Sequence, residues 1–397
     1  MSMHPLPPDE PGTKLTDEPT DGSEVADDVE TPADEPRVEV GSASQRQLIW
    51  WRFRKHKMAM IGVWILLIMY FVAAFAGFFA PYNKDSASST HAYHPPQLPQ
   101  FSISDGLYFH PTEGSTDLET LERVFEEDTS RKVPLGFFVQ GEEYKLLGLV
   151  TTDIRLFGPT ELGERFYLLG ADRSGADVLS KIIFGSQISL SIGLVGVAIS
   201  LVLGLLLGGI SGYFGGWVDN IIQRLIELIM SIPTLPMWLG LAAAIPPGWG
   251  AVPTYLMITV ILSLLGWTSL ARVIRGRLLQ TRSEDYVLAA RLDGASTGRI
   301  IGRHMMPAFT SHIIATVSLS VPAMILAETS LSFLGLGLRA PAVSWGVLLQ
   351  DAQSVNTVAT APWLLIPGLA VILAVVAFNF VGDGLRDSAD PYGKRSD

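Results

Sequence analysis

Long stretches without a charged side chain constrain this chain more than any other feature. The first covers residues 58–80, a run of 23. As an α-helix, such a run extends about 34 Å, which is enough to cross the roughly 30 Å hydrocarbon core of a bilayer. A composition of 48% hydrophobic and 17% charged residues is also typical of membrane proteins rather than soluble domains. The chain is therefore predicted to be an all-α membrane protein.

The uncharged stretches predict six transmembrane helices. In residues 184–218, Gly204, Gly208 and Gly212 recur at every fourth position and would let a neighbouring helix approach closely. Residues 228–271 are too long for one helix, and the sequence Pro-Pro-Gly-Trp-Gly in their middle predicts a tight turn that divides them into two. The six helices are expected within residues 58–80, 184–218, the two halves of 228–271, 308–338 and 352–381.

Charge is distributed unevenly, and this predicts the domain organisation. Of the formal net charge of −11, residues 1–40 carry −10, from 12 acidic and 2 basic side chains. With almost no apolar periodicity, residues 1–45 are expected to be a disordered acidic tail. Residues 46–84 hold a basic segment and the first transmembrane helix, whereas residues 85–168, with 14 acidic and 6 basic side chains, are expected to be a small, partly β insert. Residues 169–393 hold the other five helices.

The basic residues predict the orientation in the membrane, because Lys and Arg are retained on the cytoplasmic side. Five of them precede the first helix, between residues 46 and 57, and seven lie between residues 272 and 303. Both termini are therefore predicted to be cytoplasmic and the insert extracytoplasmic. No basic face remains for nucleic-acid binding once these residues are assigned, and the absence of cysteine excludes disulfides and thiolate metal sites.

A short helix is predicted in the basic loop between the fourth and fifth transmembrane helices. Thr281 and Glu284 fit a capping box, so the helix should begin near Ser283. Gly294 is placed to end it after about three turns.

This short helix is a candidate contact site for another protein. Small side chains at Ala289 and Ala290 would let a partner's groove close over the backbone, and the docking could be fixed by Tyr286, Arg291 and Asp293. For a helix of this composition taken alone, the favoured alternative is an amphipathic connector that lies on the membrane surface.

Three pieces of this loop follow one another at a recognisable spacing: Leu288-Ala289-Ala290, Gly294, and His304-Met305-Met306-Pro307. They resemble the cytoplasmic EAA loop of the inner-membrane permease subunits of ABC importers, which has Glu-Ala-Ala, a Gly four residues later and Ile-x-Leu-Pro at its end. Here the Glu is absent and His replaces Ile. Both departures are the pattern of the peptide/nickel branch of that family.

Other segments resemble the same branch, and together they cover residues 46–84 and 165–393. Matching stretches lie at residues 169–172, 177–180, 231–235, 328–337, 344–346, 378–379 and 382–387. Ala176 stands where Arg is usual before the second helix. The insert and the acidic tail are not covered.

The resemblance implies a second-type ("C"-type) permease subunit of a dipeptide or oligopeptide importer, in a bacterial or archaeal inner membrane. It implies three kinds of partner besides lipid: a homologous permease, two ATPases that bind ATP and Mg²⁺, and an extracytoplasmic solute-binding protein. It implies that the ATPase-coupling residues of this chain are Tyr286, Ala289, Ala290, Arg291, Asp293, Gly294 and Pro307. Nickel chelates and oligosaccharides remain alternative substrates.

No catalytic, cofactor or metal site is predicted within the chain itself. No Gly-x4-Gly-Lys-Ser/Thr motif is present, so a P-loop ATPase must be another polypeptide. Residues 294–298 spell a nucleophile elbow, Gly-Ala-Ser-Thr-Gly, close to His304, but a helix rather than a strand is predicted before them. A membrane-embedded hydrolase or protease is therefore the weaker alternative, and a non-transporting scaffold or sensor is the third.

Glu328 is the remaining candidate, because an ionisable group within an apolar run is costly unless it is paired or faces a water-filled cavity. It could line the solute pathway. The favoured interpretation is structural, with Ser330 and Ser332 as hydrogen-bonding partners.

Overall fold

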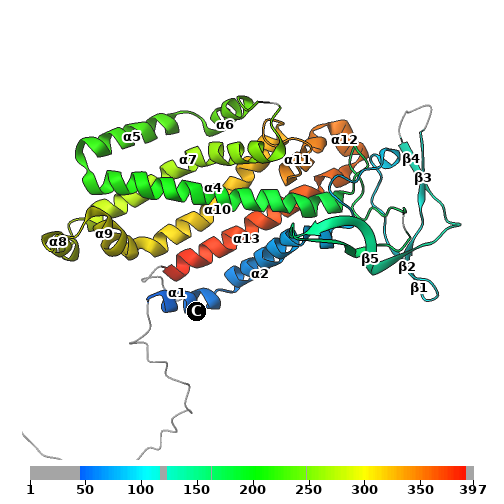
Figure 1. Ribbon diagram of the computed structural model, residues 1–397, viewed down its shortest axis with the longest axis horizontal. Helices are drawn as coiled ribbons and strands as arrows, with labels where there is room; N and C mark the ends of the chain where they lie inside the picture. The colour runs from blue at the N-terminus through cyan, green and yellow to red at the C-terminus, as the bar shows by residue number, and fades with distance from the viewer. Residues whose placement is uncertain (1–44, 117–122, 162, 247, 390–397) are drawn as a thin grey trace, which may run out of the picture. The chain divides into compact units, whose positions relative to one another are not determined.

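Long helices lie side by side in this computed structural model, which describes residues 45–116, 123–161, 163–246 and 248–389. A β-rich insert lies at one end of the helices and the short helices α8 and α9 lie at the other (Figure 1). Residues 1–44 of the predicted acidic tail (1–45) lie outside the described residues, and its last residue, Gln45, is the first residue of a helix. The boundaries predicted for that tail therefore stay a prediction.

The first transmembrane helix is shorter than its uncharged run. α1 (Gln45–Lys55) is followed by α2 (Lys57–Ala74), and the last predicted turn is a separate short helix, α3 (Ala76–Phe79). α2 packs against the C-terminal helix α13 (Ile366–Ala389). At this contact a Cβ on Gly62 would lie only 2.6 Å from the Ala377 carbonyl oxygen. The glycine thus permits the close approach of two membrane helices.

The insert is built from β-strands, so the prediction of an all-α chain holds only for the membrane part. After a 3-10 turn, η1 (Ser89–His91), the strands are β1 (Gln100–Ser102), β2 (Gly106–Phe109), β3 (Thr112–Thr116), β4 (Arg123–Glu127), β5 (Val133–Leu146) and β6 (Val150–Pro159). A four-stranded antiparallel sheet has the order β1-β2-β5-β6, and β3 pairs with β4. Its small core contains Phe109, Val133, Leu135 and Phe166.

α4 (Val178–Phe214) runs for 37 residues from the insert toward the opposite end. The Asp177 carboxylate caps it by accepting hydrogen bonds from the Ser180 amide (2.7 Å) and hydroxyl (2.6 Å). Lys181 is paired with buried Asp172. Lys181 and Ser174 hold the pKa of the Asp172 carboxyl below its usual range despite its burial, whereas burial raises the pKa of Asp177 to about 6.

The third predicted span is broken. α5 (Gly216–Ser231) and α6 (Thr234–Ala243) meet at an angle of 87°. The break falls at Ile232-Pro233, because proline removes a backbone donor and the residue before it is forced out of the helical region; Ile232 has φ −88° and ψ 130°. The turn predicted at 246–250 does separate α6 from the next helix, α7 (Ala251–Thr281), so this prediction is confirmed.

Of the last two predicted spans, 308–338 agrees with α10 (Thr310–Phe333) apart from its ends, whereas short helices occupy the first part of 352–381 and the long helix α13 begins only at Ile366. The remaining elements follow in chain order. They are α8 (Asp285–Leu292), α9 (Thr297–Arg299), η2 (Ile300–Met305), η3 (Met306–Phe309), α10, α11 (Trp345–Gln350), η4 (Asp351–Gln353), α12 (Val355–Thr360), η5 (Pro362–Leu365) and α13. Within the described residues, five helices are long and apolar enough to cross a membrane, and the bent pair makes six if it counts as one span.

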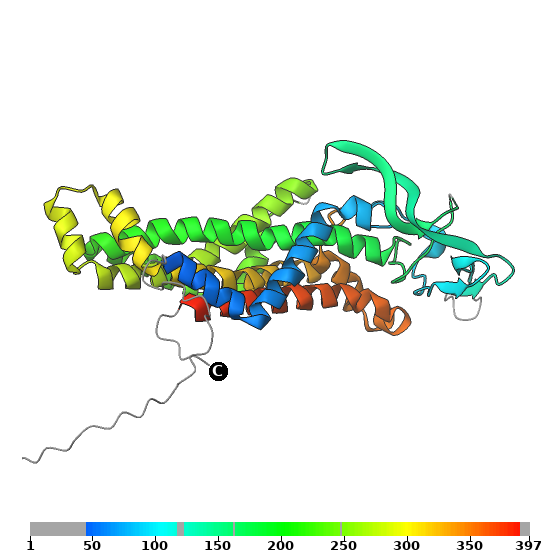
Figure 2. The same ribbon diagram turned by 90° about the horizontal axis from the view of Figure 1, so that it is seen from below.

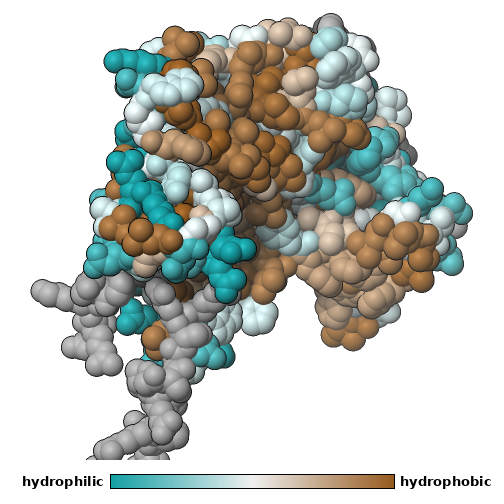
Figure 3. All heavy atoms as spheres, turned by 60° about the vertical axis from the view of Figure 1, so that its left-hand side comes forward, coloured by the Kyte–Doolittle hydropathy of each residue, from teal (hydrophilic) through white to brown (hydrophobic). Residues whose placement is uncertain are grey.

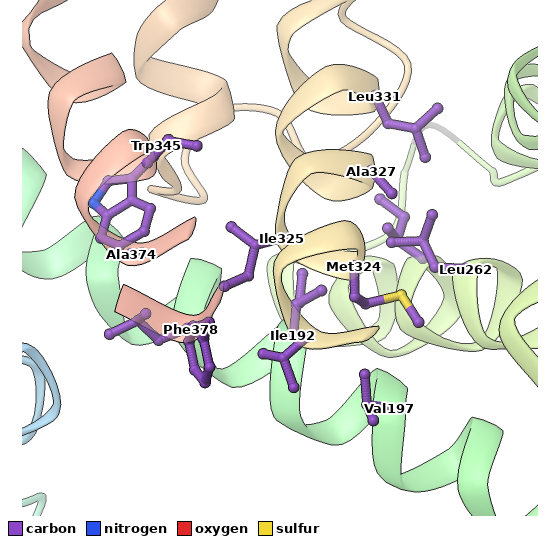
Figure 4. Packing of buried hydrophobic residues seen from close by; sticks show 14 of the residues in the cluster. Ile192, Val197, Leu262, Met324, Ile325, Ala327, Leu331, Trp345, Ala374 and Phe378 are labelled. Atoms are coloured by element: carbon purple, nitrogen blue, oxygen red, sulfur yellow. The ribbon is translucent and has the colours of Figure 1, made fainter. Parts of the chain in front are cut away.

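The helices share one apolar core and expose a second apolar surface. Met324 and Ile325 of α10 point to either side, toward Leu262 of α7 and Phe378 of α13 (Figure 4). On the outside, apolar residues gather across the middle of the face shown in Figure 3. Large side chains such as that of Leu206 are more than half exposed. An exposed apolar belt of this extent is what a lipid environment requires.

The seam between α4 and α7 is held by small residues and by hydrogen bonds. The Ser200 hydroxyl donates to the Ser263 carbonyl oxygen (3.1 Å). The Ser263 hydroxyl shares its proton between the Thr259 carbonyl oxygen of its own helix (2.6 Å) and the Gly196 carbonyl oxygen of α4 (3.0 Å). A Cβ on Gly208 would lie 2.6 Å from the Ala271 carbonyl oxygen and 2.8 Å from its Cα. The glycines that recur at every fourth position of α4 therefore lie at its contact with α7, as the sequence predicted.

Gly208→Ala should destabilise the protein by about 1–3 kcal/mol, because the new methyl group meets backbone atoms that cannot move aside. Gly209→Ala is the matched control: it brings the same gain in helix propensity, and nothing lies within 4 Å of its Cβ. Thermal unfolding in detergent should show a lower melting temperature for the first variant alone. Equal melting temperatures would contradict this account of the seam.

Candidate functional site

α8 lies at the end of the helices opposite the insert (Figures 1 and 2). Its N-cap residue is Glu284, and no side chain caps it. The predicted capping box is wrong, because the Thr281 hydroxyl donates instead to the Arg277 carbonyl oxygen (2.8 Å) within α7. Thr281 is thus the last residue of α7, and α8 begins four residues later, at Asp285.

The end of α8 is a Schellman motif. The Ala295 amide donates to the Ala290 carbonyl oxygen (3.1 Å), and the Gly294 amide donates to the Arg291 carbonyl oxygen (3.0 Å). Gly294 has φ +75°, a conformation that favours glycine, and a Cβ there would meet no atom within 4 Å. Backbone conformation rather than crowding is the reason for glycine at this position.

The inner face of α8 packs on the protein's own helices. Val287 and Ala290 are buried in a cluster with Ile274 and Leu278 of α7 and with Met305. Ala290 therefore faces this cluster and not a partner's groove, which corrects the reason given above for its small size. A larger side chain at this position would separate α8 from α7.

The outer face of α8 carries exposed apolar side chains. Tyr286 and Leu288 are each 43% exposed, and Leu292 is 90% exposed. Ala289 and Asp293 are also exposed. The sequence analysis did not name Leu292 and named Leu288 only as part of a motif, although their i, i+4 spacing indicates that both lie on one face of the helix.

Two further coupling candidates have positions within the loop rather than on its outer face. The Arg291 guanidinium lies over the Tyr213 ring, 5.1 Å from its centroid, and so attaches α8 to the end of α4. Pro307 lies in the first turn of η3, which leads directly into α10. These two residues connect the loop to the membrane helices.

Glu328 is fully buried near the end of α10. One of its carboxylate oxygens accepts hydrogen bonds from the Ser332 (2.8 Å) and Ser344 (2.7 Å) hydroxyls. Ser344 also caps α11 by accepting from the Val347 amide (3.3 Å). Ser330, the other predicted partner, donates to the Leu326 carbonyl oxygen.

This network holds the turn after α10. The Ser332 hydroxyl oxygen accepts from the Leu338 amide (3.0 Å), and the Trp345 amide donates to the Ser189 hydroxyl of α4 (3.1 Å). Glu328 thus joins α10, α11 and the segment between them, which favours the structural interpretation over a place in the pathway.

Two family models match this chain. Residues 177–392 match the binding-protein-dependent transport system inner membrane component, and residues 44–96 match the N-terminal TM domain of oligopeptide transport permease C. The chain belongs to the family of binding-protein-dependent transport system inner membrane components. This permease is accordingly a multi-pass inner-membrane transport subunit and not an enzyme, and such a subunit works with an ATPase and a solute-binding protein.

Relatives with assigned names agree with the family. The permease is 30% identical over 356 residues to the dipeptide transport system permease protein DppC of Bacillus subtilis, covering 89% of this chain and 88% of that protein. It is 40% identical to a putative peptide permease of Brucella ovis, over 60% of this chain and 78% of that one. A solved inward-facing MetNI methionine ABC transporter has 17% identity and a TM-score of 0.41 over 53% of this chain and 97% of that chain, a likeness too loose to carry an argument.

The alternative of a membrane-embedded hydrolase is not supported. In this permease, residues 294–296 follow α8, and Thr297 and Gly298 already belong to α9, so a helix and not a strand precedes the serine, contrary to what a nucleophile elbow requires.

Glu328→Gln and Glu328→Ala test the structural role. Gln retains an acceptor oxygen for the two serine hydroxyls and should keep the melting temperature close to that of the native protein. Ala leaves both hydroxyls without their acceptor and should cost about 1–3 kcal/mol. A Gln variant that is stable and assembled but fails to transport would contradict a purely structural role.

Proposed function

We propose that this permease forms half of the translocation pathway for short peptides in an ABC importer, as its second-type subunit. The main supporting observation is that the dipeptide transport system permease protein DppC of Bacillus subtilis aligns with 89% of the chain. In addition, the model of the N-terminal TM domain of oligopeptide transport permease C matches residues 44–96. Peptides are favoured over nickel chelates and oligosaccharides on this ground. Mass spectrometry of the ligand retained by the cognate binding protein distinguishes the three classes.

The proposed assembly contains this chain, a homologous second permease, two ATPases and one extracytoplasmic solute-binding protein, within membrane lipid. ATP and Mg²⁺ are bound by the ATPases, and this chain needs no cofactor of its own. The two permeases enclose the pathway between them and alternate between inward-open and outward-open states as the ATPases close and open.

In the proposed orientation both termini are cytoplasmic and the insert, residues 85–168, is extracytoplasmic. Three observations support it. Arg52, Arg54 and Lys55 lie in the last turn of α1, α8 is flanked by basic residues, and α8 and the insert lie at opposite ends of the helices. The positive-inside rule then places α1 and α8 on the same side. The permease domain proper is proposed to span residues 169–393.

The proposed coupling contact is the outer face of α8. Energy from a separate ATPase reaches the membrane helices only through a contact that does not deform. Tyr286, Leu288 and Leu292 offer an apolar surface for a groove on the ATPase, and Ala289 lets the groove approach the backbone. A movement of α8 would then be transmitted to α7 by the buried inner face of α8 and to α4 by the contact between Arg291 and Tyr213.

Gly294→Val should uncouple transport from ATP hydrolysis, because a β-branched residue at φ +75° costs on the order of 1–2 kcal/mol and would deform the end of α8. Gly294→Asn is the matched control, since asparagine tolerates this conformation. At equal protein abundance, peptide uptake should fall with Val and persist with Asn. Normal uptake with both variants would remove the coupling role from this loop.

Single-cysteine labelling tests the orientation without background, because the native chain has no cysteine. A cysteine at Ser115, in β3, should react with a membrane-impermeant maleimide added to intact cells or spheroplasts. A cysteine at Ser283, between α7 and α8, should react only after the membrane is opened. The reverse pattern would invert the proposed topology.

A further inference from the structure

The hairpin of β5 and β6 ends in an apolar tip formed by residues 146–150, Leu-Leu-Gly-Leu-Val. Leu147, Leu149 and Val150 are 57%, 86% and 60% exposed. A contiguous run of exposed apolar side chains on an otherwise acidic insert indicates a contact surface rather than a surface that stays exposed to solvent. Hereafter these five residues are the hairpin tip.

The backbone of the hairpin tip is strained by its apolar sequence. Leu147 has φ +51° and Gly148 has φ +73°, and the Leu149 amide donates to the Leu146 carbonyl oxygen (3.0 Å). Asn, Asp and Gly are the residues that suit the first of these positions in a hairpin turn. A large apolar side chain is therefore held at a position where a small polar residue would fit the backbone better, which points to a function for the side chain.

The hairpin lies against the helix that ends the first transmembrane segment. The Tyr144 ring packs on Gly77 of α3, where a Cβ would come within 2.2 Å of it. The Phe138 ring lies 6.1 Å from that of Phe78, which belongs to a row of phenylalanines at this end of α2 and α3. Phenylalanine side chains partition favourably into a membrane, so this row suits a lipid-facing position.

Arg155 fixes this arrangement. Its guanidinium is fully buried and donates to the carbonyl oxygens of Ala80 (2.8 Å), Gly77 (3.3 Å) and Glu142 (2.9 Å) and to the Asn83 side-chain oxygen (2.8 Å). One side chain thus joins β6, β5 and the carbonyl end of α3. The direction of the hairpin relative to the helices is set by these bonds.

The hairpin tip reaches back to the level of the membrane helices. Figure 2 shows β5 and β6 curving from the far end of the insert toward the helices. A cavity of about 850 Å³ separates the two. Leu146 and Leu147 line it together with Ala74 of α2 and Phe184 and Gln187 of α4, and its other lining residues are mostly polar and include Lys84, Asp85, Glu142 and Glu143. Gln187 lies nine residues into α4, roughly 14 Å from its first residue. The tip therefore lies level with the end of α2 and with the first turns of α4.

We propose that the hairpin tip is a lipid-contact site, which places Leu147, Leu149 and Val150 in the interfacial layer of the bilayer. The exposed apolar surface of α2 at the same end includes Phe71, which is 56% exposed, and the hairpin meets this end where Tyr144, two residues before the tip, packs on Gly77 beside Phe78. A phospholipid surface suits both the apolar tip and Lys145 beside it, whose amine can stay at the headgroup level. The identity of the contacted leaflet rests on the orientation proposed above. The depth of the tip in the bilayer does not depend on that orientation.

A fluorescent label tests the depth of the tip in the assembled importer, reconstituted in phospholipid nanodiscs. An environment-sensitive nitrobenzoxadiazole group is attached to a cysteine in place of Leu149. The matched control is Ile103→Cys in the same insert, on a side chain that is 99% exposed. Quenching is measured with lipids that carry a nitroxide near the headgroup end of the acyl chain, and separately with aqueous iodide.

The label at position 149 should be quenched several-fold more by the nitroxide lipid than the label at 103, and several-fold less by iodide. Equal quenching of the two labels by iodide would overturn the proposal. Protection from both quenchers at position 149 would also overturn it and would assign the tip to a protein partner instead. Peptide uptake by the unlabelled cysteine variants is measured in parallel, so that a failure of the lipid contact is distinguishable from a failure of the importer assignment.

Discussion

The close approach of α4 and α7 determines where the other parts of this permease lie. Lipid offers no hydrophobic gain for bringing two apolar helices together, so their contact depends on packing and on hydrogen bonds between them. Gly204, Gly208 and Gly212 remove the side chains that would keep the backbones apart. Ser200 and Ser263 add hydrogen bonds to carbonyl oxygens across the seam. The two helices consequently form one stiff unit that extends from the insert to the loop at the other end.

The proposed coupling helix is attached to both members of this unit. α8 begins four residues after α7 ends, and Val287 and Ala290 pack back on α7. Arg291 contacts Tyr213 at the end of α4. A force applied to the outer face of α8 would therefore be shared by α4 and α7, and Glu328 and its serines would hold α10 and α11 against the other end of the same bundle.

Sequence patterns predicted what depends on local chemistry and missed what depends on tertiary contacts. Uncharged runs located the spans, and Gly294 ended α8 as expected, because length, charge and a left-handed backbone are local properties. The break at Pro233 was missed because apolar residues continue on both sides of it. The inward position of Ala290 and the use of the Thr281 hydroxyl by α7 could be seen only once α7 and α8 were packed together.

The central claim is that an ATPase subunit contacts the outer face of α8. Photo-cross-linking in the assembled importer tests it most directly, with a benzophenone maleimide attached to Leu292→Cys and, as an equally accessible control in the insert at the other end of the helices, to Ile103→Cys. The account predicts an ATPase adduct from position 292 and none from position 103. An intact complex that gives no adduct at 292, or equal adducts at both positions, would contradict it.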